Sequence, residues 1–214
     1  MGNSCSNLYQ KNEDQLNTEL LRQYDGQSYL RLRKTLIPLF TLLYHPKIIN
    51  REAIPVEGPI LIAGNHRSIL DPLFVCAATE RIVHFMAKRE LHEDFYGKFF
   101  DLAETIPVNR DQKDPHSIDI AYGLLNSGRA IGIMPEGRVN KTNEELLPLK
   151  FGTVALAKKT QALIIPFGLT GSFKPFHYDM CIRFGQPLDI AELELSEANR
   201  LLSCKIKELI HTQE

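Results

Sequence analysis

From residue 60 onward, apolar runs of strand length alternate with segments of helix length. The short apolar runs predict strands at residues 60–63, 82–86, 105–108, 130–134, 163–169 and 181–184. The longer segments predict helices at residues 73–79, 91–102, 117–125, 151–159 and 190–210. Near-continuous apolar strands separated by helices are typical of an α/β domain. We therefore expect a single domain with a mostly buried mixed sheet flanked by helices.

An N-terminal region, residues 1–50, precedes this alternation and is expected to be helical, with residues 51–214 forming the main domain. Within it, Leu30–Tyr44 is rich in Leu, Ile and Phe. Three cations open this segment: Arg31, Arg33 and Lys34. Its apolar part is shorter than the ~20 residues of a spanning helix, and Pro38 is expected to kink it. Two interpretations stay open, because the segment can lie in a membrane interface with its cations on anionic headgroups, or pack on the sheet.

Size, charge and cysteine spacing limit the classes of function that fit this chain. A chain of 214 residues and 24.4 kDa has the size of one domain. A net charge of −1 and a pI of about 6.7 provide no basic field for nucleic acid. No secretory signal is expected, because residues 7–19 are polar. The scattered cysteines lack metal-binding spacing and favour a reduced, cytosolic setting. They are Cys5, Cys76, Cys181 and Cys204.

The first six residues fit a pattern for N-myristoylation. Gly2 is the acceptor in this pattern, and Cys5 is a candidate for palmitoylation. The pattern is short, occurs often by chance and has no meaning in a bacterial chain. Lipidation of Gly2 therefore stays an open hypothesis.

The segment Asn65–Asp71 is the candidate for acid–base chemistry. It sets His66 five positions before Asp71, and a histidine held by a carboxylate is a device for taking a proton from a hydroxyl. The chain has no Gly-x-Ser-x-Gly nucleophile elbow, so this hydroxyl is expected to belong to the substrate. The structural alternative makes His66 a strand-end residue with a satisfied hydrogen bond. In that alternative Asp71 is the N-cap of a helix that begins at Pro72.

Further charged residues follow other predicted strands. Lys88 and Arg110 stand at strand ends, at the sheet edge where open α/β sheets bind ligands. The planar fork of an arginine suits a phosphate or a carboxylate. The turn Glu136, Gly137 and Arg138 follows another strand, where the carboxylate can orient a substrate hydroxyl and the arginine can meet a phosphate. The alternatives are solvated surface charges and a polar turn that closes the strand.

In this order, the motifs resemble those of glycerolipid acyltransferases of the lysophosphatidic acid acyltransferase type, the 1-acylglycerol-3-phosphate O-acyltransferases. Four blocks between residues 54 and 187 carry the resemblance. They are Asn-His-x-x-x-x-Asp at Asn65, His66 and Asp71, a phosphate-binding Arg110 after an Ile-Pro-Val strand, the turn Pro135-Glu136-Gly137, and an apolar strand with Pro166. One block departs from the family, which usually reads Glu-Gly-Thr-Arg. Here Arg138 follows Gly137 directly, so its guanidinium is expected to sit differently and Lys141 to share its role.

The resemblance implies transfer of a fatty acyl group from acyl-CoA or acyl-carrier protein to the hydroxyl of lysophosphatidic acid, giving phosphatidic acid for phospholipid synthesis. It implies that His66 takes the hydroxyl proton and that Asp71 fixes the imidazole and stabilises the imidazolium. The implied substrate-binding residues are Lys88, Arg110, Glu136, Gly137 and Arg138. No metal, cofactor or covalent acyl-enzyme is expected. The expected location is the cytoplasmic face of a membrane, peripheral or monotopic.

Two alternatives to this activity stay open. One is acylation of glycerol 3-phosphate or of another lysophospholipid. The other is a non-catalytic, membrane-associated protein of the same fold.

Overall fold

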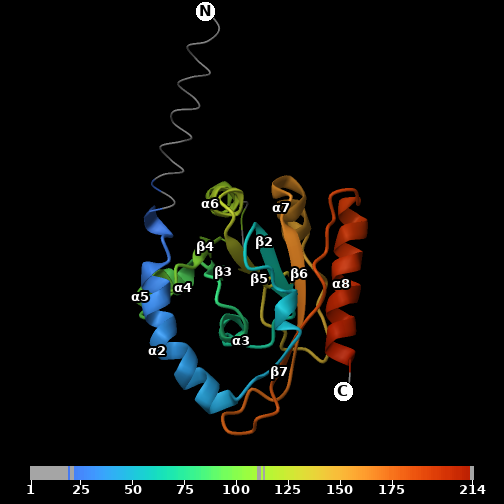
Figure 1. Cartoon of the computed structure of the whole chain (residues 1–214). Helices are drawn as coiled ribbons and strands as arrows, with labels where there is room; N and C mark the ends of the chain where they lie inside the picture. The colour runs from blue at the N-terminus through green and yellow to red at the C-terminus, as the bar shows by residue number, and fades with distance from the viewer. Residues whose placement is uncertain (1–18, 20–21, 110–111, 113, 213–214) are drawn as a thin grey trace, which may run out of the picture.

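The structure, a computed structural model, describes residues 19, 22–109, 112 and 114–212. Within them, a seven-stranded sheet carries helices on both faces (Figure 1). The strands are β1 (Lys47–Ile49), β2 (Ile60–Gly64), β3 (Val83–Lys88), β4 (Ile106–Val108), β5 (Ala130–Ile133), β6 (Leu163–Thr170) and β7 (Cys181–Phe184). Their order is β1-β7-β6-β2-β5-β3-β4, and all neighbours run parallel except the antiparallel pair β6 and β7. The expected mixed α/β sheet is confirmed.

The helices form two layers, one on each face of the sheet. The first layer contains α2 (Gln27–Tyr44) and α3 (Asp71–Ala78). The second contains α6 (Pro115–Asn126), α7 (Gly152–Thr160) and α8 (Leu195–His211). Two short helices, α4 (Glu90–Glu93) and α5 (Gly97–Leu102), join β3 to β4, and a 3₁₀ turn (Arg51–Ala53) precedes β2. Figure 1 shows α2 and α8 at opposite sides of the molecule.

Strand β2 shows how the sequence builds both layers at once. Its side chains alternate, so Ile60 and Ile62 pack with the α2–α3 layer while Leu61 and Ala63 pack with the α6–α7–α8 layer. All four are at most 1% exposed. A strand buried on both faces has to be apolar at every position, which is why β2 reads as a continuous apolar run.

The proline of β6 limits pairing on one side of this strand, the side that faces β7. β6 lies between β2 and β7, and Pro166 pairs with Ala63 of β2. Pairing with β7 begins only at Phe167, and on the other side of the proline Ile164 bridges to Leu188. Pro166, which has no N–H to donate, therefore occupies the gap between two segments of pairing.

The sequence predicts one continuous helix at residues 91–102, and this prediction is wrong. The structure divides it into α4 and α5, with a turn in which the Gly97 N–H donates to the Asp94 carbonyl at 2.8 Å. A Cβ atom at Gly97 would collide with the carbonyl oxygen of His92, so glycine permits this close return. The turn leaves Phe95 exposed.

Two other expectations also differ from the structure. The last helix begins at Leu195 rather than at residue 190, and residues 190–194 form an irregular connection before it. The short strand β1 was not predicted. It has only three residues, of which Lys47 is exposed, and it pairs with β7 at one edge of the sheet. An edge strand of this length has almost no apolar signature.

The N-terminal segment forms helix α2, which continues through Pro38. Its inner face is part of the core, because Tyr29, Phe40 and Tyr44 are buried and the Phe40 ring meets the Phe74 ring edge to face at 4.7 Å. Leu39 and Leu42 lie on the outer face and are more than half exposed. The inner face therefore packs as one of the two interpretations predicts.

No helix in the described ranges is both long enough and apolar enough to cross a membrane.

Candidate active site

The Asn65–Asp71 segment forms a turn at the carboxyl end of β2. Asn65 fixes this turn to β6, because its side-chain amide donates to the Leu169 carbonyl at 2.9 Å and accepts the Leu169 N–H at 2.7 Å. His66, the next residue, is bonded to the loop after β5, where the Asn140 N–H donates to the His66 carbonyl at 2.7 Å. The backbone of His66 is thus held from two sides.

His66 and Asp71 form a buried pair. Nδ1 of His66 lies 2.7 Å from Oδ2 of Asp71, whose side chain is fully buried. The same carboxylate accepts the backbone N–H of Arg67 at 2.8 Å and that of Ser68 at 3.0 Å. A carboxylate surrounded by donors acts as acceptor only, which assigns the imidazole proton to Nδ1. Nε2 is therefore the nitrogen that can accept a proton.

The structural alternative for Asp71 is wrong. The N-cap residue of α3 is Leu70, and Asp71 and Pro72 follow as the first helical residues. The Asp71 carboxylate points back at the turn that precedes the helix, not at the N–H groups of the helix itself. It therefore orients His66 rather than capping α3.

Glu136 connects this turn to two other parts of the chain. Its Oε1 accepts the His66 N–H at 2.6 Å, and its Oε2 accepts the Leu147 N–H at 2.8 Å. The side chain is nearly fully buried, and this burial raises the pKa of Glu136 although its hydrogen bonds with Leu147 and His66 oppose the shift. Both oxygens meet backbone donors, so the geometry gives Glu136 a positioning role, and the substrate contact expected from the sequence stays a prediction.

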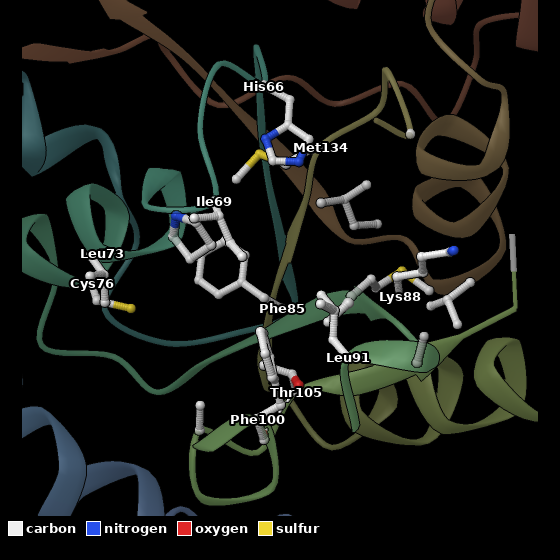
Figure 2. A pocket seen from close by; sticks show the side chains of 18 of the residues that line it. His66, Ile69, Leu73, Cys76, Phe85, Lys88, Leu91, Phe100, Thr105 and Met134 are labelled. Carbon is white, nitrogen blue, oxygen red and sulfur yellow. Dashed lines mark hydrogen bonds between the residues drawn. The ribbon is translucent and has the colours of Figure 1, made fainter. Parts of the chain in front are cut away.

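A cavity of about 760 Å³ opens beside His66. Figure 2 shows His66 and Met134 at one end and Phe100 and Thr105 at the other, with Cys76 and Lys88 on opposite sides. Most of the lining is apolar and comes from both helix layers, from β3 and from α4–α5. The labelled apolar side chains are Ile69, Leu73, Phe85, Leu91, Phe100 and Met134. Such a cavity suits a long hydrocarbon chain with one polar end near the imidazole.

Comparisons with known proteins identify the family. The family model described as Acyltransferase matches residues 45–170 of this chain. The 1-acyl-sn-glycerol-3-phosphate acyltransferase of Bacillus subtilis is 31% identical over 178 residues, which cover 76% of this chain and 87% of the relative.

The chain belongs to the acyltransferase family.

Two further proteins extend the comparison. The 1-acyl-sn-glycerol-3-phosphate acyltransferase of Helicobacter pylori is 33% identical over 123 residues, covering 56% of this acyltransferase and 52% of the relative. The crystal structure of the 1-acyl-sn-glycerophosphate (LPA) acyltransferase PlsC from Thermotoga maritima superposes with a TM-score of 0.65, covering 91% of this chain and 88% of that one. At 16% identity, this superposition shows a shared fold.

The predicted cations of this acyltransferase differ in where they lie relative to the cavity. Lys88, at the end of β3, lines the cavity and pairs with Glu90 at 3.0 Å. Arg138 is exposed and does not line the cavity, whereas Gly137 does. Lys141 is likewise exposed and outside the lining. Arg110 lies outside the described residues.

Sequence reasoning missed Lys150, a lining residue close to the Glu136 turn. Its backbone N–H donates to the Pro135 carbonyl at 2.9 Å. Its side chain lies across Gly137, whose φ of 73° is in the left-handed region, and a Cβ atom at Gly137 would be 2.9 Å from the Lys150 Nζ. The signal available in the sequence was a lysine directly before the predicted helix at 151–159, which alone predicts no particular partner.

Proposed function

We propose that this acyltransferase moves a fatty acyl group from a thioester to the free hydroxyl of lysophosphatidic acid, giving phosphatidic acid for phospholipid synthesis. The observation that carries the proposal is the His66–Asp71 pair at one end of a large apolar cavity. The relatives named as 1-acyl-sn-glycerol-3-phosphate acyltransferases support the choice of acceptor.

In the proposed reaction, Nε2 of His66 takes the proton of the acceptor hydroxyl while the hydroxyl oxygen attacks the thioester carbonyl carbon. The new C–O bond forms, the carbonyl becomes an oxyanion, and Asp71 stabilises the imidazolium across the 2.7 Å contact. The oxyanion then collapses and the C–S bond breaks. The imidazolium returns its proton to the departing thiolate, so the enzyme ends in its starting state without a covalent intermediate.

The apolar cavity takes the acyl chain in this proposal. Removal of a hydrocarbon chain from water contributes roughly 0.8 kcal/mol for each buried CH₂, which favours a lined cavity over an open surface. The donor is acyl-CoA or acyl-carrier protein, and no metal or cofactor takes part. Lys88 and Arg110 are proposed to meet the acceptor phosphate, because cations form strong charge-assisted hydrogen bonds with phosphate oxygens.

We also propose that the protein works at a membrane surface, at its cytoplasmic face. Helix α2 supplies the support, because Leu39 and Leu42 are exposed on its outer face beside the exposed cations Arg31 and Lys34. Apolar residues flanked by cations on one helix face suit an anionic lipid interface.

Purified protein tested against a panel of acceptors with both donors is the deciding experiment. Lysophosphatidic acid, glycerol 3-phosphate, other lysophospholipids and a monoacylglycerol are each offered with acyl-CoA and with acyl-carrier protein. We expect lysophosphatidic acid to give the highest kcat/KM, and His66→Ala to abolish the product. A higher kcat/KM for another acceptor would contradict the proposed substrate, and no transfer to any acceptor would contradict the activity.

A further inference from the structure

The start of α7 lines the same cavity as His66. Gly152 and Thr153, the first two residues of this nine-residue helix, line the cavity together with His66, Pro135 and Gly137. The first turn of a helix presents N–H groups that have no partner within the helix, and the helix dipole makes this end attractive to anions. Two neighbouring side chains, those of Thr153 and Lys150, add a hydroxyl and a cation to this helix start.

The first observation is the hydroxyl of Thr153. The residue is 2% exposed, and its Oγ1 is buried without a hydrogen-bond partner among the described residues. Buried polar side chains are almost always satisfied, because an unpaired one costs free energy. Thr160 at the other end of α7 shows the ordinary arrangement, with its hydroxyl donating to the Leu156 carbonyl at 2.8 Å. Thr153 is therefore placed to meet a group that enters from the cavity.

The second observation is the ammonium of Lys150. It lies across Gly137, the residue that follows Glu136 in the chain. The Glu136 carboxylate accepts the His66 N–H at 2.6 Å. The Lys150 backbone is itself bonded to Pro135 of the same turn. The Lys150 cation is thus joined to the turn that positions His66, and Lys150, Thr153 and the start of α7 all line one cavity.

We propose that Lys150, the Thr153 hydroxyl and the first turn of α7 form a binding subsite for a phosphate monoester in the cavity beside His66, in addition to the phosphate contacts proposed above for Lys88 and Arg110. The proposal rests on the proposed function, in which the acceptor carries a phosphate a few bonds from the hydroxyl that reacts. The donor thioester also carries phosphate groups, so the same chemistry has two sources. The acceptor is the source favoured here, because the subsite is bound to the turn that holds the base.

The test uses Thr153→Val and Lys150→Ala, each with a matched control on α7. Valine keeps the shape of threonine and removes an unpaired polar atom, so the thermal stability of Thr153→Val should stay the same or rise. The controls are Thr160→Val, which removes a partnered hydroxyl, and Lys159→Ala, which removes a cation that lies over the Tyr122 ring. Neither control residue lines the cavity.

For each variant, KM is measured for lysophosphatidic acid, for a monoacylglycerol and for the donor. We expect Thr153→Val and Lys150→Ala to raise KM for lysophosphatidic acid by about ten-fold or more, the scale of a hydrogen bond to a charged group. KM for the phosphate-free acceptor should not change, and Lys150→Arg should restore part of the loss. A rise confined to the donor would support the subsite and identify the donor as the phosphate source. An unchanged KM for all three, or an equal rise for the phosphate-free acceptor, would overturn the subsite.

A second measurement separates this proposal from the proposed function. Inorganic phosphate, at an ionic strength matched with chloride, should raise the unfolding temperature of the full chain and of both controls. It should have less effect on Thr153→Val and Lys150→Ala. If the protein acylates no acceptor but shows this pattern, the subsite stands and the proposed function fails. If phosphate stabilises parent and variants equally, the subsite is wrong whatever the activity.

Discussion

At the scale of single residues, the carboxylate of Asp71 determines what His66 can do. It accepts the Nδ1 proton at 2.7 Å and two backbone N–H groups, so it defines both the ring orientation and the tautomer. His66→Ala should lower kcat by ~10²–10⁴-fold, because the general base is lost. Asp71→Asn should also be severely impaired, since an amide can turn its NH₂ toward Nδ1 and favour the wrong tautomer.

Steady-state kinetics with circular dichroism and thermal unfolding check this first prediction. The fold should be retained in His66→Ala, whose side chain supports little of the core. Near-parent turnover by folded His66→Ala would refute the assignment of the base. Near-parent turnover by Asp71→Asn would show that the carboxylate is not needed to orient the imidazole.

Glu136 allows a second test at this scale. Both of its oxygens accept backbone N–H groups, and a glutamine can offer only one acceptor, so its NH₂ would oppose the N–H of His66 or Leu147. We expect Glu136→Gln to lower the free energy of unfolding by ~1–3 kcal/mol and to lower kcat. Because burial raises the pKa of Glu136, losing its charge should by itself favour the folded state, so a net loss reports the missing acceptor.

Denaturant unfolding and kcat are measured beside Glu144→Gln, an exposed glutamate in the same loop. If Glu136→Gln matches this control in both quantities, the carboxylate does not position His66. If stability is unchanged but KM for the acceptor rises, Glu136 contacts substrate as the sequence predicted.

Residues close in the chain were easier to predict than residues brought together by the fold. His66 and Asp71 are five positions apart, so their spacing alone indicated the pair. The contact of Glu136 with the His66 N–H joins residues 70 positions apart, and its partners are backbone groups that no side-chain pattern reveals. Lys150 meets Gly137 across a left-handed turn that joins residues 13 positions apart.

At the scale of elements, the buried strands were predicted to within about two residues, because strands covered on both faces must be apolar throughout. Elements that do not have to be apolar throughout were predicted less well. The edge strand β1 was missed, and the break between α4 and α5 depends on the close return at Gly97. The Asp114 carboxylate joins the start of α6 to Arg89, the residue that follows β3.

Asp114 carries the third prediction. As N-cap of α6 it accepts the Ser117 N–H at 3.3 Å, and it also accepts the Asn109 N–H at 2.8 Å and pairs with Arg89 at 2.9 Å. These interactions lower the pKa of Asp114, and the hydrogen bond from the Asn109 N–H has the largest effect. A carboxyl with a lowered pKa in the folded state stabilises the protein above its unfolded pKa of ~3.9 and loses this effect as the pH falls through the folded value.

Asp114→Ala should therefore lower the free energy of unfolding by about 1 kcal/mol at pH 7, the usual loss for a cap. The difference from the parent should shrink as the pH falls below about 4. Urea unfolding across this range tests it, with Asp119→Ala, an exposed residue of the same helix, as control. A difference that is constant with pH would show that the charge of Asp114 does not stabilise α6.

At the scale of the whole molecule, helix α2 gives one face to the core and the other to solvent. The three cations predicted to act together are separated by this arrangement. Arg33 is only 12% exposed in its side chain and lies 3.3 Å from Glu80, whereas Arg31 and Lys34 are exposed. The sequence could not separate them, because helix rotation is set by which residues pack, here Tyr29, Phe40 and Tyr44.

Vesicle binding should therefore depend on Arg31 and Lys34. Reversal of both charges, Arg31→Glu with Lys34→Glu, should weaken binding to anionic vesicles by roughly thirty-fold, at ~1 kcal/mol per residue, and salt should weaken the parent in the same way. The matched control is Arg200→Glu with Lys207→Glu, which makes the same change of net charge on the exposed surface of α8, on the opposite side of the molecule (Figure 1). Flotation with vesicles that contain increasing fractions of anionic lipid measures both proteins. An equal loss in both would indicate attraction by net charge alone. Binding by the α2 variant at the parent's level would show that the outer face of α2 does not contact the lipid, and would leave Leu39 and Leu42 as ordinary exposed residues.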